Sequence, residues 1–96
     1  MAISGDPVSK PINVEIFTAP NCNRCGRAVT LVQSVAEELG DGIQWRRVDV
    51  IAELDYAVAT GVLATPAIAI DGNLVFTSLP TRDKLYRTLQ QHLTES

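Results

Sequence analysis

One stretch decides how this chain folds: Pro20-Asn21-Cys22-Asn23-Arg24-Cys25. It contains both cysteines of the chain, in C-x-x-C spacing, and it lies between an extended apolar run and a helical pattern. We therefore expect a strand to end just before the two thiols and a helix to begin at Cys22. The rest of the chain is expected to present this pair.

The segment before the cysteines has the composition of a strand. From Asn13 onward, the residues that favour a strand are Val14, Ile16 and Phe17. Residues 18–21, Thr-Ala-Pro-Asn, then have the composition of a turn.

The segment after Cys22 has helical periodicity, because small or apolar residues recur with the i, i+3, i+4, i+7 spacing of one buried helix face. They are Cys25, Ala28, Val29, Val32, Val35, Ala36 and Leu39. Gly40 or Gly42 is the expected end of this helix. Residues 43–50 are then predicted to form a second strand, parallel to the first because a helix connects them.

In the second half of the chain, turn-forming and helix-ending residues separate the predicted elements. Residues 51–60 predict a short helix that stops at Gly61. Residues 67–70 and 74–76 predict two strands, and the Asp71-Gly72 pair between them is typical of a two-residue hairpin turn. Thr81 can cap a last helix whose apolar face carries Leu85, Leu89 and Leu93. The predicted order is β-α-β-α-β-β-α.

Composition predicts one compact domain, since the chain has 96 residues of which 46% are hydrophobic. We expect a flexible leader over residues 1–11 and a single domain over residues 12–96. A net charge of -3 argues against nucleic-acid binding. No apolar run approaches the roughly 18 residues of a membrane span, and the first residues contain no apolar signal core. We therefore expect a cytoplasmic monomer with no membrane partner.

The cysteine spacing predicts a reactive dithiol. One helical turn separates Cys22 from Cys25, so both sulfurs face the same side and can form a disulfide. At the helix start, the macrodipole should lower the Cys22 pKa below its ordinary value of about 8.5, and Arg24 and Arg27 could add to this effect. Cys25 lies deeper on the buried face. We expect Cys22 to attack a substrate disulfide and Cys25 to resolve the mixed disulfide.

Two simpler interpretations of the cysteines remain. They could be small core residues, although core packing does not require a position at a helix start. They could also bind zinc, but a structural zinc site normally has four nitrogen or sulfur ligands, and this chain offers two thiols and the distant His92. We expect no metal and no cofactor.

The chain resembles the thioredoxin-fold superfamily, and most of all its small glutaredoxin-like thioredoxins. The resemblance spans residues 13–93 and is carried by residues 17–25, Phe-Thr-Ala-Pro-Asn-Cys-Asn-Arg-Cys, and by Ala64-Thr65-Pro66-Ala67. It implies an α/β fold with a four-stranded mixed sheet and helices on both faces. It also implies that Pro66 follows a cis peptide bond and packs against the dithiol, while Thr65 offers backbone hydrogen bonds to the substrate.

The chain departs from the better-known members of this superfamily. Thioredoxins typically have Trp before the first cysteine and Gly-Pro between the two, where this chain has Asn21 and Asn23-Arg24. The glutathione-binding Gly-Gly-Asp-like stretch of glutaredoxins is replaced by residues 77–83, where Thr77, Ser78 and Asp83 are weak candidates for that role. The buried acidic residue of thioredoxin has no obvious counterpart, because Glu15 is expected to face outward.

The resemblance implies a thiol–disulfide oxidoreductase that exchanges its dithiol with protein disulfides. A thioredoxin reductase-type enzyme or a low-molecular-weight thiol would supply the electrons. Two alternatives stay open: a carrier that holds a metal or an iron–sulfur centre at Cys22 and Cys25, and an interaction module whose dithiol is idle.

Overall fold

The computed structural model describes residues 11–95. The leader predicted over residues 1–11 lies almost wholly outside this range, so the predicted domain division stays a prediction. The described residues form the elements β1 (Ile12–Thr18), α1 (Cys25–Leu39), β2 (Ile43–Asp49), α2 (Leu54–Thr60), β3 (Ala67–Ile70), β4 (Asn73–Phe76) and α3 (Arg82–Glu95). The predicted β-α-β-α-β-β-α order is confirmed.

The strands form one mixed sheet in the order β2-β1-β3-β4. β1 and β2 run parallel, as a helical crossover between them requires, while β1–β3 and β3–β4 are antiparallel. Asp71 and Gly72 both have positive φ, 51° and 84°, which is the backbone of a two-residue hairpin turn. The predicted hairpin is therefore confirmed.

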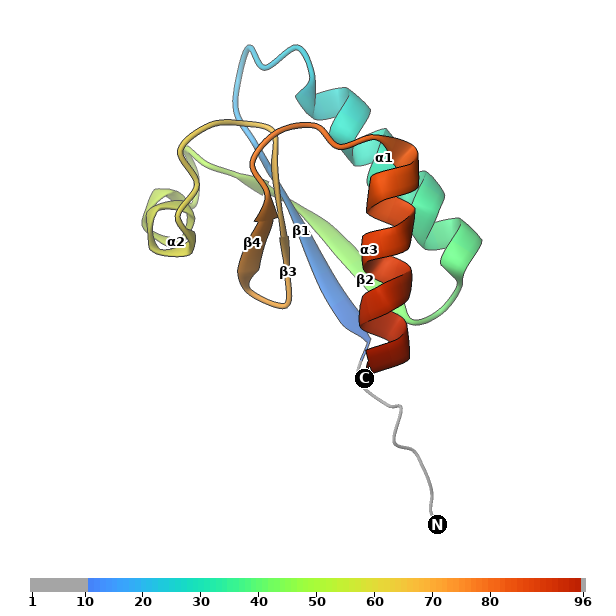
Figure 1. The fold of residues 1–96 in the computed structure, drawn as a ribbon. Coiled ribbons are helices and arrows are strands. Elements are labelled where there is room, and N and C mark those ends of the chain that lie inside the picture. The colour runs from blue at the N-terminus through green and yellow to red at the C-terminus, as the bar shows by residue number, and fades with distance from the viewer. Residues whose placement is uncertain (1–10, 96) are drawn as a thin grey trace.

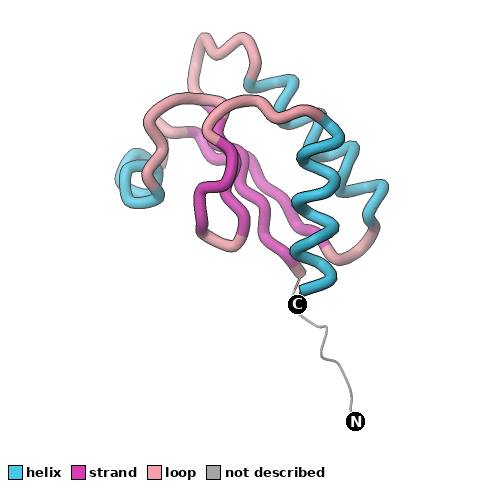
Figure 2. Tube along the Cα trace, viewed as in Figure 1, coloured by secondary structure: helices cyan, strands magenta, loops and turns pink. Residues whose placement is uncertain are grey.

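Helices cover both faces of the sheet, as predicted (Figure 1). α1 and α3 lie together on one face, and α2 lies on the other (Figures 1 and 2). The core under α1 and α3 contains Ile12, Val14 and Ile16 of β1, Ile68 and Ile70 of β3, and Val32, Val35, Leu85 and Leu89 of the two helices. The core on the α2 side is smaller and consists of Phe17, Val48, Ala57, Ala67 and Ala69.

Three local signals in the sequence act as predicted. Gly40 ends α1 with φ 89°, and Gly61 ends α2 in the left-handed conformation, where its N–H bonds the carbonyls of Ala57 and Val58. The Thr81 hydroxyl accepts the N–H of Lys84 at 3.2 Å and so caps α3. These residues set the lengths of the helices on both sides of the sheet.

The predicted starts of α1 and α2 were too early. α1 begins at Cys25 and not at Cys22, because Asn21 takes a left-handed φ of 64° and residues 22–24 form a turn. α2 begins at Leu54 and not at residue 51, because the Asp49 carboxylate accepts the N–H of Ile51 at 2.8 Å and holds residues 50–53 in turns. In each case a local polar or backbone turn delays the helix by three residues.

The expectation for Glu15 was wrong, because only 8% of this residue is exposed. Its side chain lies on the α2 face, where Arg46 is its neighbour in the β1–β2 register. Arg46 and Tyr56 both donate hydrogen bonds to its carboxylate. A buried carboxylate is tolerated here because it is paired and hydrogen-bonded.

Candidate active site

The two cysteines form a disulfide, with their Cα atoms 5.5 Å apart. The predicted closure of the C-x-x-C pair is therefore confirmed. The two residues differ in exposure: Cys22 is half-buried and lines an open hollow, whereas Cys25 is 2% exposed on the buried face of α1. A partner molecule can reach the sulfur of Cys22 more readily than that of Cys25.

A short turn attaches Cys22 to the start of α1. The Cys25 N–H points to the Cys22 carbonyl at 3.4 Å, and the Ala28 N–H donates to the Arg24 carbonyl at 3.0 Å as the first helical bond. The Arg24 side chain makes no cap hydrogen bond. The first N–H groups of a helix have no helical acceptor, so this end of α1 is a favourable place for an anion such as a thiolate.

The loop before β3 brings the second predicted segment to the dithiol. Thr65 lines the same hollow as Cys22, together with Pro20, Asn21, Asn23 and Arg24, and the hollow has a volume of about 440 Å³. The Thr65–Pro66 peptide bond is cis, as the resemblance implied, and Pro66 is buried. The fold thus brings Cys22 and Thr65 together although 43 positions separate them in the sequence.

The two arginines predicted to tune the thiol are both exposed. Arg24 immediately precedes α1 and lines the hollow of Cys22. Arg27 lies one turn further along α1 and lines a second hollow of about 440 Å³ with Gly26, Thr30, Leu31 and Ser34. Both guanidinium groups therefore belong to the surface around the helix start.

A charged cluster on the α2 face was missed by sequence reasoning. Arg46 donates to Glu15 Oε2 from Nε at 3.0 Å and from Nη2 at 2.7 Å, and Tyr56 donates its hydroxyl to Glu15 Oε1. Arg46 also pairs with Glu53 at 3.4 Å and lies 5.7 Å from the centre of the Tyr56 ring. The parallel β1–β2 register, which places Glu15 beside Arg46, is the signal that could have revealed this cluster.

The cluster shifts the protonation of its members. The hydrogen bond to Glu15, followed by burial, raises the Tyr56 pKa above its ordinary value of 10.0. The hydrogen bond to Glu15 also raises the Arg46 pKa above its ordinary value. Tyr56 therefore holds its proton more tightly in the folded protein than in the unfolded chain.

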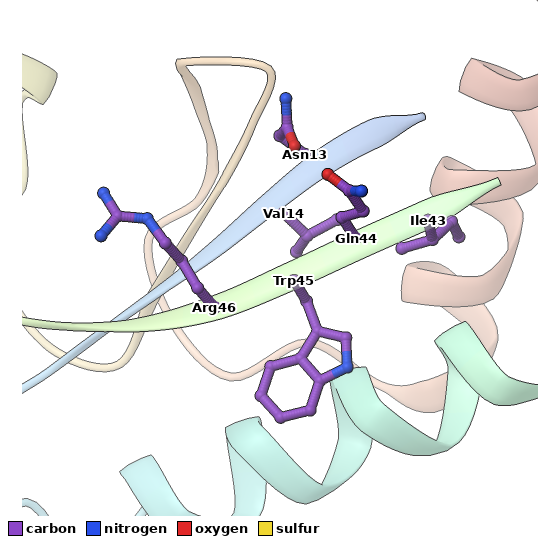
Figure 3. Close-up of a pocket in the computed structure, with 6 residues that line it drawn as sticks. All are labelled: Asn13, Val14, Ile43, Gln44, Trp45 and Arg46. Atoms are coloured by element: carbon purple, nitrogen blue, oxygen red, sulfur yellow. The ribbon is translucent and has the colours of Figure 1, made fainter. Parts of the chain in front are cut away.

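A hollow of about 490 Å³ lies elsewhere, along β1 and β2 (Figure 3). Its lining residues are Asn13, Val14, Ile43, Gln44, Trp45 and Arg46. Figure 3 shows Trp45 pointing from β2 toward α1, where it packs against the larger core, while Arg46 points to the other side of the strand. Neither cysteine lines this hollow, so it is separate from the dithiol.

The described residues give little support for a metal site, a glutathione site or a membrane span. Within residues 11–95, no group of three or more His, Cys, Asp or Glu side chains could hold a metal ion. Asp83, a weak candidate for binding glutathione, forms an ion pair with Arg87 at 3.2 Å. No helix in this part of the chain is long and apolar enough to cross a membrane.

Comparison with known proteins agrees with this geometry. The family model described as "Thioredoxin domain" matches residues 12–90. The chain is 33% identical to a probable thioredoxin of Methanothermobacter thermautotrophicus over 82 residues, which is 85% of this chain and 96% of that protein. It is 30% identical to a thioredoxin of Methanocaldococcus jannaschii over the same shares of the two chains.

Solved structures share the fold at lower identity. Thioredoxin 1 of Thermosipho africanus superimposes with a TM-score of 0.71 at 20% identity, over 86% of this chain and 96% of that one. A protein disulfide oxidoreductase of Aeropyrum pernix gives a TM-score of 0.77 at 24% identity, over 92% of this chain and 40% of that one. With the disulfide between Cys22 and Cys25, these matches show that the chain belongs to the thioredoxin domain family and is a thiol–disulfide oxidoreductase.

Proposed function

We propose that this protein reduces protein disulfides, with Cys22 as the nucleophile and Cys25 as the resolving thiol. The observation that carries the proposal is the difference in exposure between the two cysteines. Cys22 lines an open hollow, and Cys25 is almost fully buried. A bulky disulfide can therefore approach only one of the two sulfurs.

The proposed reaction moves two electrons from the dithiol to the substrate. The Cys22 thiolate attacks one sulfur of the substrate disulfide, so that a new S–S bond forms while the substrate bond breaks and one substrate thiolate leaves. The Cys25 thiol loses its proton and attacks the Cys22 sulfur, which releases the second substrate thiolate. The substrate thiolates take up protons, and the protein is left with the disulfide seen in the structure.

The surrounding residues have supporting roles in this proposal. The N-terminus of α1, together with Arg24 and Arg27, stabilises the Cys22 thiolate and lowers its pKa. Thr65 offers its backbone to an extended substrate segment beside Cys22, and the buried Pro66 fixes that loop against the dithiol. The positions of Thr65 and Arg24 in the hollow of Cys22 support these roles.

The cycle needs a reductant and a reducing compartment. We place the protein in the cytoplasm, as a monomer that a thioredoxin reductase-type enzyme or a low-molecular-weight thiol returns to the dithiol state. Structural disulfides are rare in that compartment, and a C-x-x-C pair there is typical of redox catalysis.

A trapping experiment tests the assignment of the two cysteines. The reduced Cys25→Ser variant, mixed with a disulfide-containing protein, should accumulate a stable mixed disulfide on Cys22, because nothing remains to resolve it. Non-reducing electrophoresis and peptide mapping identify the linked residue. The matched Cys22→Ser variant should trap almost nothing; a partner found on Cys25 of that variant would show that the roles are reversed.

A further inference from the structure

The surface around the dithiol differs in charge from the rest of the molecule. Residues 16–36, which pass from β1 through Cys22 into α1, contain no acidic residue, and their only charged residues are Arg24 and Arg27. Residues 56–70, which include Thr65 and Pro66, contain no charged residue at all. The chain as a whole carries a net charge of -3, so these two segments form a positive region on an acidic protein.

The other arginines of the described residues already have partners. Arg46 pairs with Glu15 and Glu53, Arg82 with Glu38, and Arg87 with Asp83. Arg47 donates from Nε to the Thr18 hydroxyl at 3.1 Å. Among residues 11–95, no carboxylate lies within ion-pair distance of Arg24 or Arg27, so both can receive an acidic group from another molecule.

Asp49 is the acidic residue at the end of the sheet where β1 leads into the cysteine turn, and its carboxylate is already hydrogen-bonded. Asp49 ends β2 opposite Thr18 of β1, and the chain leaves Thr18 toward the cysteines. The Asp49 carboxylate accepts the N–H groups of Ile51 at 2.8 Å and Ala52 at 3.4 Å. It therefore serves the turn into α2, and Arg24 is the charged residue that lines the hollow of Cys22.

We infer that the protein disulfides reduced by this protein carry acidic side chains next to the attacked cysteine, and that these side chains bind against Arg24 and Arg27. Arg24 shares the hollow of Cys22, and Arg27 lines the next hollow along α1, so a segment linked to Cys22 meets both guanidinium groups. Opposite charges at a rim steer encounter and select partners. This inference rests on the proposed reduction of protein disulfides at Cys22.

Matched peptide disulfides test this selectivity. Three peptides share one sequence except that glutamate, glutamine or lysine flanks the disulfide-bonded cysteine, and the second-order rate constant of their reduction by the dithiol protein is measured at low salt. The glutamate peptide should react roughly three- to tenfold faster than the lysine peptide, as expected for one or two exposed charge pairs. The ratio should fall toward one at about 1 M salt, where the Debye length is about 3 Å.

Variants show whether the arginines are responsible. The double variant Arg24→Gln/Arg27→Gln should abolish the preference, and Arg24→Glu/Arg27→Glu should invert it; both side chains are exposed, so the fold should tolerate these changes. The ratio of two peptide rates on one variant cancels any change in the Cys22 pKa. Arg87→Gln, which removes one exposed positive charge from α3, should keep the wild-type ratio.

The outcomes distinguish a failure of this inference from a failure of the proposed disulfide reduction on which it rests. Equal rates for the three peptides, or a preference that survives the Arg24→Gln/Arg27→Gln change, would overturn the inference and leave disulfide reduction in place. Failure to reduce any of the peptides would overturn the proposed reduction itself, and the inference with it.

Discussion

The two faces of the sheet are built on different principles. The face under α1 and α3 is closed by aliphatic side chains from both helices and from alternating positions of β1 and β3. The face under α2 has a smaller core with three alanines, and its outer part is completed by Glu15, Arg46 and Tyr56. The face under α1 and α3 is stabilised by buried apolar area, and the face under α2 also contains a buried carboxylate that is paired with Arg46.

This difference reflects what each face carries. α1 begins at the dithiol, so the aliphatic layer beneath α1 and α3 is the support that fixes the position of Cys25 and the turn to Cys22. α2 has seven residues and leaves Leu54 and Val58 more than half exposed. A helix this short buries little apolar surface, and the hydrogen bond from Tyr56 to Glu15 helps to fix it on the sheet.

The largest effect is expected from truncating the aliphatic face. Leu89→Ala removes a fully buried side chain from α3 and should lower the free energy of unfolding by about 2–5 kcal/mol. Leu74→Ala, the same truncation of a half-buried residue on the α2 face, should cost less. Leu63→Ala is the control, because Leu63 is 99% exposed, and it should stay within about 0.5 kcal/mol. Urea unfolding measures all three; equal losses for Leu89 and Leu74 would contradict the difference between the faces.

A smaller effect is expected from removing the buried charge. Glu15→Gln keeps the size of the side chain but takes the carboxylate from Arg46 and Tyr56, and should cost about 1–3 kcal/mol. The control is Glu38→Gln, which breaks an ion pair with Arg82 whose two side chains are about half exposed, and should cost at most about 1 kcal/mol. If both variants unfold at the same urea concentration, Glu15 is no more important than a surface charge.

The smallest effect is a change in the pH dependence of stability. Because the Tyr56 pKa is raised in the folded protein, the unfolded chain loses this proton first as the pH rises. The stabilisation is complete below the unfolded-state pKa of about 10 and is lost as the pH rises through the folded-state value. Tyr56→Phe should therefore flatten the fall of stability above that pH in urea unfolding, and Glu15→Gln should flatten it too. An unchanged slope in Tyr56→Phe would contradict the assigned hydrogen bond.

The sequence correctly predicts those features that depend on a residue's own backbone conformation or on the geometry of its own helix or strand. Asp71-Gly72 predicts the hairpin because the turn needs positive φ at both positions, and Gly61 predicts the end of α2 for the same reason. The recurrence of small and apolar residues predicts the buried face of α1 because it depends only on helical geometry. The C-x-x-C spacing likewise predicts the disulfide.

The errors arose where the outcome depends on distant or competing contacts. Glu15 alternates with apolar residues and so is predicted to face water, but its burial depends on Arg46, 31 positions away, and on Tyr56, 41 positions away. The start of α1 depends on the left-handed backbone of Asn21, which composition alone does not reveal. That Arg24 and Arg27 have no ion-pair partner among residues 11–95 is likewise visible only once the partners of the other arginines are known.

The strand order has a consequence for behaviour at high protein concentration. β2 and β4 are the two edges of the sheet, and an open edge can pair with the edge of another copy. β2 carries the exposed charged residues Arg46, Arg47 and Asp49, and β4 has only four residues. Charge on one edge and shortness of the other oppose edge-to-edge aggregation, so the molecule can remain dispersed through repeated cycles of oxidation and reduction.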